Sequence, residues 1–125
     1  MKYAMLVYSD QSSWEGLPEE EASRLRAESM PRWITLFEEM GKADPTATGK
    51  ELVGASEAKV VRVVNGETIV TDGPYAEVKE SLGGYYLFSC DSMEEAIAWA
   101  AKIPAAWHGG AIEVRPVHVD EEAAA

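Results

Sequence analysis

Residues 72–80 place carboxylates beside an amine on a stiff stretch of backbone, reading Asp-Gly-Pro-Tyr-Ala-Glu-Val-Lys-Glu. Three carboxylates and one ammonium group lie within these nine residues. A positioned carboxylate can move a proton as a general acid or base, and a cation beside it can hold an anionic substrate. Strand-like runs flank the segment, and loops carried by strands often hold binding and catalytic residues. This segment is therefore the first candidate site.

Asp72 is the first candidate within it. One interpretation makes Asp72 a general base or acid, tuned by partial burial between strands. The structural alternative is that its side chain accepts hydrogen bonds from nearby backbone N–H groups and closes the turn that Gly73 and Pro74 begin. Both interpretations remain open from the sequence.

Three further residues are candidates for substrate binding. In an extended segment Glu77 and Lys79 point the same way, so together they would bind a polar or anionic group. Their structural alternative is a surface ion pair worth less than about 1 kcal/mol. Arg115 lies among apolar neighbours on the last predicted strand. It would pair with Asp72 or Glu77 across the sheet, or bind a substrate carboxylate in a bidentate manner.

His108 follows the second predicted helix and is a candidate acid–base group near neutral pH. The alternative is a loop histidine without a catalytic role. The other histidine, His118, lies far from it, and the single cysteine, Cys90, ends an apolar strand and is expected to be a buried thiol. Without a cluster of histidines and cysteines, the sequence predicts no metal site and no cofactor.

The aromatic residues allow two interpretations. They would form the core or a subunit interface, or they would line a pocket. The residues concerned are Tyr8, Trp14, Trp33, Tyr86 and Trp107.

The composition narrows the class of protein. The chain has 125 residues, 46% of them hydrophobic, and a net charge of −11. A surface this acidic repels phosphate backbones, so we expect no nucleic-acid partner. No apolar run approaches the roughly 20 residues that span a bilayer, and the first residues lack a secretory signal, so we expect a cytoplasmic protein without a membrane partner.

Periodicity predicts the helices and strands. A helix over residues 18–40 is expected to kink or break near residues 29–30 because of Pro31, and to end at Gly41. A second helix begins at residue 91 and ends at Pro104; Ser92 with Glu95 fits a capping box, and Asp91 is the competing cap. The expected strands are residues 2–9, 60–64, 67–71, 84–90 and 111–119, with a further short strand at 51–53.

Two features of these strands refine the expected sheet. Asn65-Gly66 between two runs of β-branched residues predicts a tight hairpin. Pro116 predicts that the last strand lies at an edge or contains a bulge. The order β-α-β-β-β-α-β predicts an α+β, ferredoxin-like fold with one mostly antiparallel sheet and two helices on one face. The other face is expected to pair with a second copy, giving a homodimer.

The run from Val70 to Glu80 resembles the DGPF motif of the YCII-related proteins. The likeness continues through Gly83-Gly84-Tyr85-Tyr86-Leu87 and the residues from Trp99 to Ala106, and ends at Ile112-Glu113-Val114-Arg115-Pro116. The chain is therefore identified as a member of that family, with a single domain over residues 1–119 and a flexible acidic, alanine-rich tail over 120–125. Two departures stand out. Tyr75 replaces the motif's usual Phe, and the helix-one histidine of the wider superfamily's histidine–aspartate dyad is absent.

The resemblance implies a dimeric α/β-barrel made of two ferredoxin-like subunits, and it implies no settled activity. Enzymes of the muconolactone-isomerase type belong to the wider superfamily, and some related domains are associated with extracytoplasmic-function sigma factors. One expectation is therefore a small enzyme doing isomerase-like or lyase-like acid–base chemistry on a small organic acid. The other is a non-catalytic ligand-binding or regulatory dimer, linked to sigma-factor signalling.

In the first case the expected catalytic residues are Asp72 and His108. The expected substrate-binding residues are Tyr75, Glu77, Lys79 and Arg115, and the expected ligand is a small anionic molecule.

Overall fold

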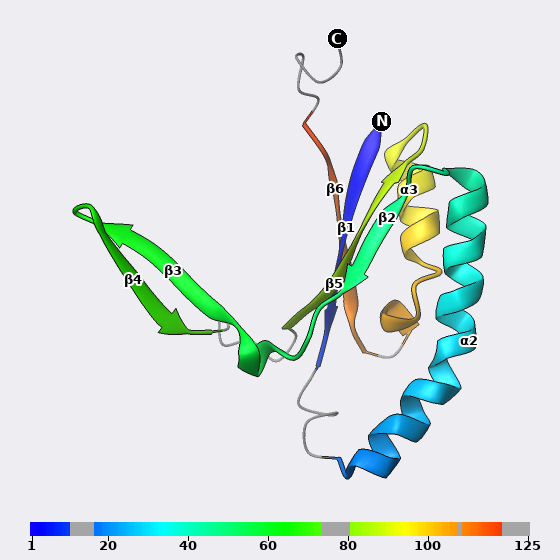
Figure 1. Ribbon diagram of the computed structural model, residues 1–125. Helices are drawn as coiled ribbons and strands as arrows, with labels where there is room; N and C mark the ends of the chain where they lie inside the picture. Colours follow the sequence, from blue (N-terminus) through cyan, green and yellow to red (C-terminus); the bar gives the residue numbers. More distant parts are fainter. Residues whose placement is uncertain (11–16, 74–80, 108, 119–125) are drawn as a thin grey trace.

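A four-stranded antiparallel sheet with two helices on one face forms the body of the protein (Figure 1). The computed structural model describes residues 1–10, 17–73, 81–107 and 109–118. The strand order is β2-β5-β1-β6, with every pair antiparallel. This is the ferredoxin-like arrangement that the order of elements predicted. The bounds are β1 Lys2–Ser9, β2 Thr48–Glu51, β5 Ser81–Ser89, β6 Ala111–Pro116, α2 Glu19–Ala43 and α3 Met93–Ala100.

The core lies between the sheet and the two helices. Alternate residues of β1, Tyr3, Met5 and Val7, are buried against the helix layer, as the two-residue period of a strand requires. Tyr86 and Phe88 of β5 lie in the same layer, next to β1 in the sheet. The helices contribute Leu36, Met40, Ala96 and Ala100 to this core.

The opposite face of the sheet has no helix over it (Figure 1). Leu6 of β1 lies beside Tyr85 of β5, and Ala4 lies beside Leu87. These four residues alternate with the core residues and are half-buried. The strands are therefore apolar on both faces, although one chain covers only one of them.

Helix α2 differs from its prediction at two places. It continues without a break through Pro31, and Figure 1 shows its N-terminal part set at an angle to the rest, so the proline bends the helix but does not end it. It also ends at Ala43, not before Gly41, with Asp44 as the C-cap residue. The prediction of a C-cap at Gly41 was wrong because Asp44 supplies the stop.

Asp44 anchors the turn between α2 and β2. It is 8% exposed and is the one buried charged residue among those the structure describes. Its carboxylate accepts hydrogen bonds from the Thr46 hydroxyl at 2.6 Å, the Thr46 N–H at 3.0 Å and the Ser89 N–H at 2.8 Å. The last of these ties the turn to β5. Strand β2 follows this turn. It begins at Thr48, three residues before the strand expected at 51–53.

A separate two-stranded hairpin follows β2. It consists of β3 (Lys59–Val64) and β4 (Glu67–Asp72), joined by Asn65 and Gly66 with φ of 51° and 81°. These positive angles confirm the tight turn predicted from Asn-Gly. The short 3₁₀ turn η1 (Ala55–Glu57) precedes it, and Figure 1 shows the hairpin projecting from the body on the side opposite the helices.

The C-terminal third follows the predicted pattern closely. Ser92 caps α3, because its Oγ accepts the Glu95 N–H at 3.1 Å, and the Glu95 carboxylate accepts the Asp91 N–H in return. A 3₁₀ turn, η2 (Pro104–Trp107), leads to β6. Strand β6 lies at the sheet edge, as Pro116 predicted. Neither α2 nor α3 carries a stretch that is long and apolar enough to cross a membrane, within the part of the chain that the structure describes.

Replacing Asp44 by Asn should lower the free energy of unfolding at pH 7 by about 1–3 kcal/mol, since the amide cannot accept all three hydrogen bonds. Chiefly the Thr46 hydroxyl, and also the Ser89 and Thr46 N–H groups, hold the pKa of Asp44 below its ordinary value despite burial. This lowered pKa stabilises the fold above the ordinary pKa of an aspartate, and the contribution is lost as the pH falls through the folded-state pKa.

Urea unfolding of both proteins at pH 7, 5 and 3 measures this effect. The difference in free energy of unfolding between wild type and Asp44→Asn should be similar at pH 7 and 5 and clearly smaller at pH 3. Glu38→Gln, at an exposed position of α2, is the control and should show neither effect. A constant difference at all three pH values would contradict the role of the ionised carboxylate.

Candidate functional site

Asp72, the first sequence candidate, is the last residue of β4 and lies opposite Lys59 of β3. Its Oδ1 forms an ion pair with the Lys59 ammonium group. The two side chains are 86% and 64% exposed, so the structure of the single chain does not place Asp72 in the partly buried position that the acid–base interpretation expected. An ion pair this exposed contributes little to stability.

Gly73 closes the base of the hairpin. Its N–H donates to the Ala58 carbonyl at 2.7 Å. A Cβ at this position would lie 2.8 Å from the Ala58 Cβ, so the two chain segments approach closely only because residue 73 is glycine. The described part of the motif thus closes the open end of the hairpin.

Arg115 lies on β6 opposite Ala4, on the uncovered face of the sheet. It forms an ion pair with Glu113, two residues away on the same strand and the same face. Asp72 and Arg115 therefore each have another partner, and the structure does not bring them together in the single chain.

The remaining sequence candidates, Tyr75, Glu77, Lys79 and His108, lie outside the described residues. His118 is exposed after β6. Across the described ranges, no group of three or more His, Cys, Asp or Glu side chains is placed to hold a metal ion.

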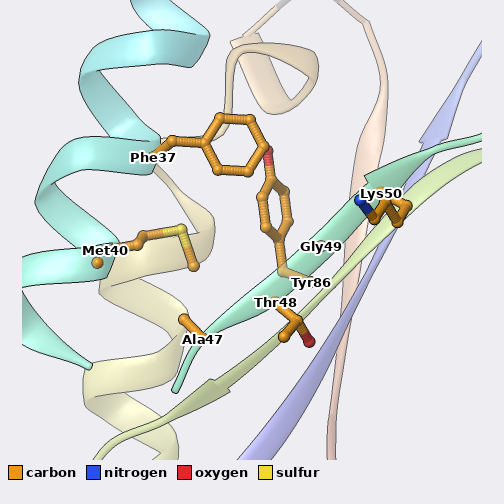
Figure 2. A pocket seen from close by; sticks show the side chains of 8 residues that line it. Phe37, Met40, Ala47, Thr48, Gly49, Lys50 and Tyr86 are labelled. Atoms are coloured by element: carbon orange, nitrogen blue, oxygen red, sulfur yellow. The ribbon is translucent and has the colours of Figure 1, made fainter. Parts of the chain in front are cut away.

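A cavity of about 290 Å³ lies between α2 and the edge strand β2, away from the hairpin. Figure 2 shows Phe37 and Met40 entering it from the helix, and the Tyr86 ring rising toward Phe37 from the sheet. Its size is at the lower end of the range for small-molecule sites. The lining residues are Phe37, Met40, Gly41, Ala47, Thr48, Gly49, Lys50 and Tyr86.

Aromatic packing shapes the inner wall of this cavity. The Tyr86 ring stacks with Trp33 at a centroid distance of 6.4 Å and meets Phe37 in a tilted arrangement at 5.4 Å. Gly49 is essential to this packing, because a Cβ there would lie 2.7 Å from the Tyr86 ring. Phe37 is 48% exposed, so its ring lies where the cavity opens to solvent.

The electrostatics of the cavity favour binding over proton transfer. Burial, and then the nearby Glu51 carboxylate, raise the pKa of the Tyr86 hydroxyl far above its ordinary value, so this group stays protonated. The Arg26 guanidinium of α2 pairs with Glu51 at 3.1 Å, which links the helix to β2 beside the cavity. Among the lining residues Lys50 is the only charged one.

Cys90 behaves as predicted from its apolar strand. It is buried, and burial raises the pKa of its thiol, so the reactive thiolate is disfavoured. Its carbonyl accepts a hydrogen bond from the amino group of Met1 at 3.0 Å. The residue is structural in the single chain.

Sequence patterns indicated this cavity only in part. Tyr86 and Trp33 were among the aromatic residues with a pocket as one interpretation, and Phe37 and Met40 belong to the apolar stripe of α2. The contribution of β2 was missed. Gly49 within a strand is the signal that could have found it, since glycine in a strand often marks close approach of another group.

Known proteins similar to this chain identify its family. The model of the YCII-related domain matches residues 1–119. The chain belongs to the YCII-related family. An uncharacterised protein of Rhizobium meliloti (strain 1021) is 39% identical over 118 residues, which cover 94% of this chain and 92% of the relative. The family predicted from the sequence is thus confirmed, and the DGPF branch within it stays a prediction.

Two glycines of the cavity should respond oppositely to alanine. Gly41 lies inside α2, and a methyl group added there would have no other atom within 4 Å, so Gly41→Ala should raise the free energy of unfolding by up to about 1 kcal/mol. Gly49→Ala should lower it by about 1–3 kcal/mol, because the methyl group would meet the Tyr86 ring. Urea unfolding measures the free energy of unfolding of both variants. Equal effects of the two changes would contradict the close packing of Gly49 against the Tyr86 ring.

Proposed function

We propose that this YCII-related protein is a homodimer that binds a small, mainly apolar organic molecule in the cavity between α2 and β2. The cavity is the observation that carries the proposal. Its walls are mainly the apolar side chains of Phe37, Met40 and Tyr86, which would contact the carbon skeleton of a ligand.

The polarity of the ligand follows from the side chains that enter the cavity. Lys50 borders it, but Lys50 lies opposite Tyr85 in the register, so its side chain leaves from the uncovered face of the sheet. The chain carries a net charge of −11, so a neutral, mainly apolar ligand is favoured over an anionic one. Tyr86, which stays protonated, offers a hydroxyl and not a base. Binding without catalysis is the function that these groups support best.

The uncovered sheet face supports the homodimer. Leu6, Tyr85 and Leu87 form an apolar area there, with the Glu113–Arg115 pair on the same face along β6. In a twofold dimer this face meets itself, so the apolar areas cover each other and the charged pairs can pair across the axis. A regulatory role, including a sigma-factor link, would need such a dimer to meet a further protein.

Acid–base catalysis at Asp72 is the second candidate. The exposure of the Asp72 carboxylate supports it, because a substrate in solution can reach this side chain. Asp72→Asn should then abolish turnover of a small organic acid with the fold intact, measured by product formation and circular dichroism. Turnover retained in the variant would remove Asp72 from that role.

For the proposed ligand site, benzyl alcohol and benzoate are suitable probes because they match in size and differ in charge. Benzyl alcohol at about ten times its Kd should stabilise the protein by about 1.4 kcal/mol and raise the Tm by about 5 °C. Benzoate at the same concentration should raise the Tm much less. Thermal unfolding followed by fluorescence measures both, with isothermal titration to obtain the Kd.

Gly41→Leu fills the cavity and should remove the effect of benzyl alcohol. Ala27→Leu adds the same side chain at an exposed position of α2 outside the cavity and serves as the matched control. If benzyl alcohol binds wild type and Gly41→Leu equally, the cavity is not the site.

A further inference from the structure

The β3–β4 hairpin exposes branched apolar side chains to an unusual degree. Val61, Val63 and Val70 are 61%, 68% and 58% exposed. The register pairs Val61 with Val70 and Val63 with Thr68, so all three valines lie on one face of the hairpin. We call this group the valine face. Monomeric proteins seldom leave such a contiguous apolar patch uncovered.

The hairpin also lacks support from its own chain. In the described residues β3 and β4 contact mainly each other and belong to no larger sheet. A two-stranded hairpin alone is marginally stable in water, and both of its outer edges carry unpaired backbone groups. A surface that packs on the valine face would supply the missing stability.

The position of the hairpin indicates which surface that is. Figure 1 shows it projecting on the side of the sheet opposite α2 and α3. That is the side of the uncovered face that carries Leu6 and Leu87. A molecule that packs on the uncovered face is therefore next to the hairpin, and the two surfaces can contact the same partner.

Charge favours a second copy as that partner. The chain has a net charge of −11, so two copies repel each other over most of their surfaces. Residues 59–72 hold two cations, Lys59 and Arg62, and two anions, Glu67 and Asp72, and are neutral. The hairpin is thus a part of the chain that an acidic second copy does not repel.

We propose that the β3–β4 hairpin is an arm that packs its valine face against a second copy of this chain. The inference rests on the homodimer proposed above and adds a second contact surface to it. Gly73 and Ala58 close the base of the arm, so its two strands are paired along their whole length.

Sedimentation of the full chain over a dilution series tests the arm. Val63→Lys should raise the Kd of the dimer about tenfold or more, since it places a charge in the centre of the valine face. Thr71→Lys is the matched control. It makes the same change of charge at an exposed position on the opposite face of the hairpin, where Thr71 lies beside Val60, and it should change the Kd less than about twofold.

A second variant distinguishes loss of the contact from unfolding of the hairpin. The triple change Val61→Thr, Val63→Thr and Val70→Thr keeps β-branched side chains and removes apolar area, so it should also raise the Kd while circular dichroism retains the wild-type spectrum. A wild-type dimer whose Kd neither variant changes would overturn the arm alone. A wild-type chain that is monomeric throughout would overturn the homodimer and the arm together.

Discussion

The structure depends on one constraint, the alternation of side chains along strands that carry helices on only one face. Tyr3, Met5 and Val7 of β1 turn into the helix layer and make the core. Their neighbours Ala4 and Leu6 are forced onto the other face by the same alternation, yet they are also apolar. Strand β1 is therefore apolar on both faces, and the helices of the chain cover one of them.

The cavity depends on the same sheet through its edge strand. Strand β2 pairs with β5 through its own backbone, and Asp44 joins the turn before β2 to β5 through the Ser89 N–H. The cavity lies between this strand and α2, where Phe37 and Tyr86 meet. Gly49 lets the Tyr86 ring lie close against the strand. One buried carboxylate thereby links the end of the helix to the sheet beside the cavity.

Local signals made much of the fold predictable, and non-local ones account for the misses. The turn at Asn65-Gly66 and the cap at Ser92 each depend on residues within a few positions, and both were found from the sequence. The end of α2 depends on Asp44 and a bond to β5 45 residues away, so Gly41 was a misleading signal. Arg115 pairs with Glu113, two residues away on the same face, a partner that was not predicted from the sequence.

The site was harder to predict than the fold because its walls come from distant segments. Phe37 and Tyr86 are almost 50 residues apart, and neither carries a motif. Residues 72–80 were the first candidate site because of their charges. The structure describes the first two of these residues, and they lie at the base of the hairpin. Asp72 pairs across the hairpin with Lys59, and Gly73 permits contact with Ala58. These contacts join the two ends of the hairpin, so strand pairing alone gives a structural reason for an aspartate followed by a glycine at positions 72 and 73.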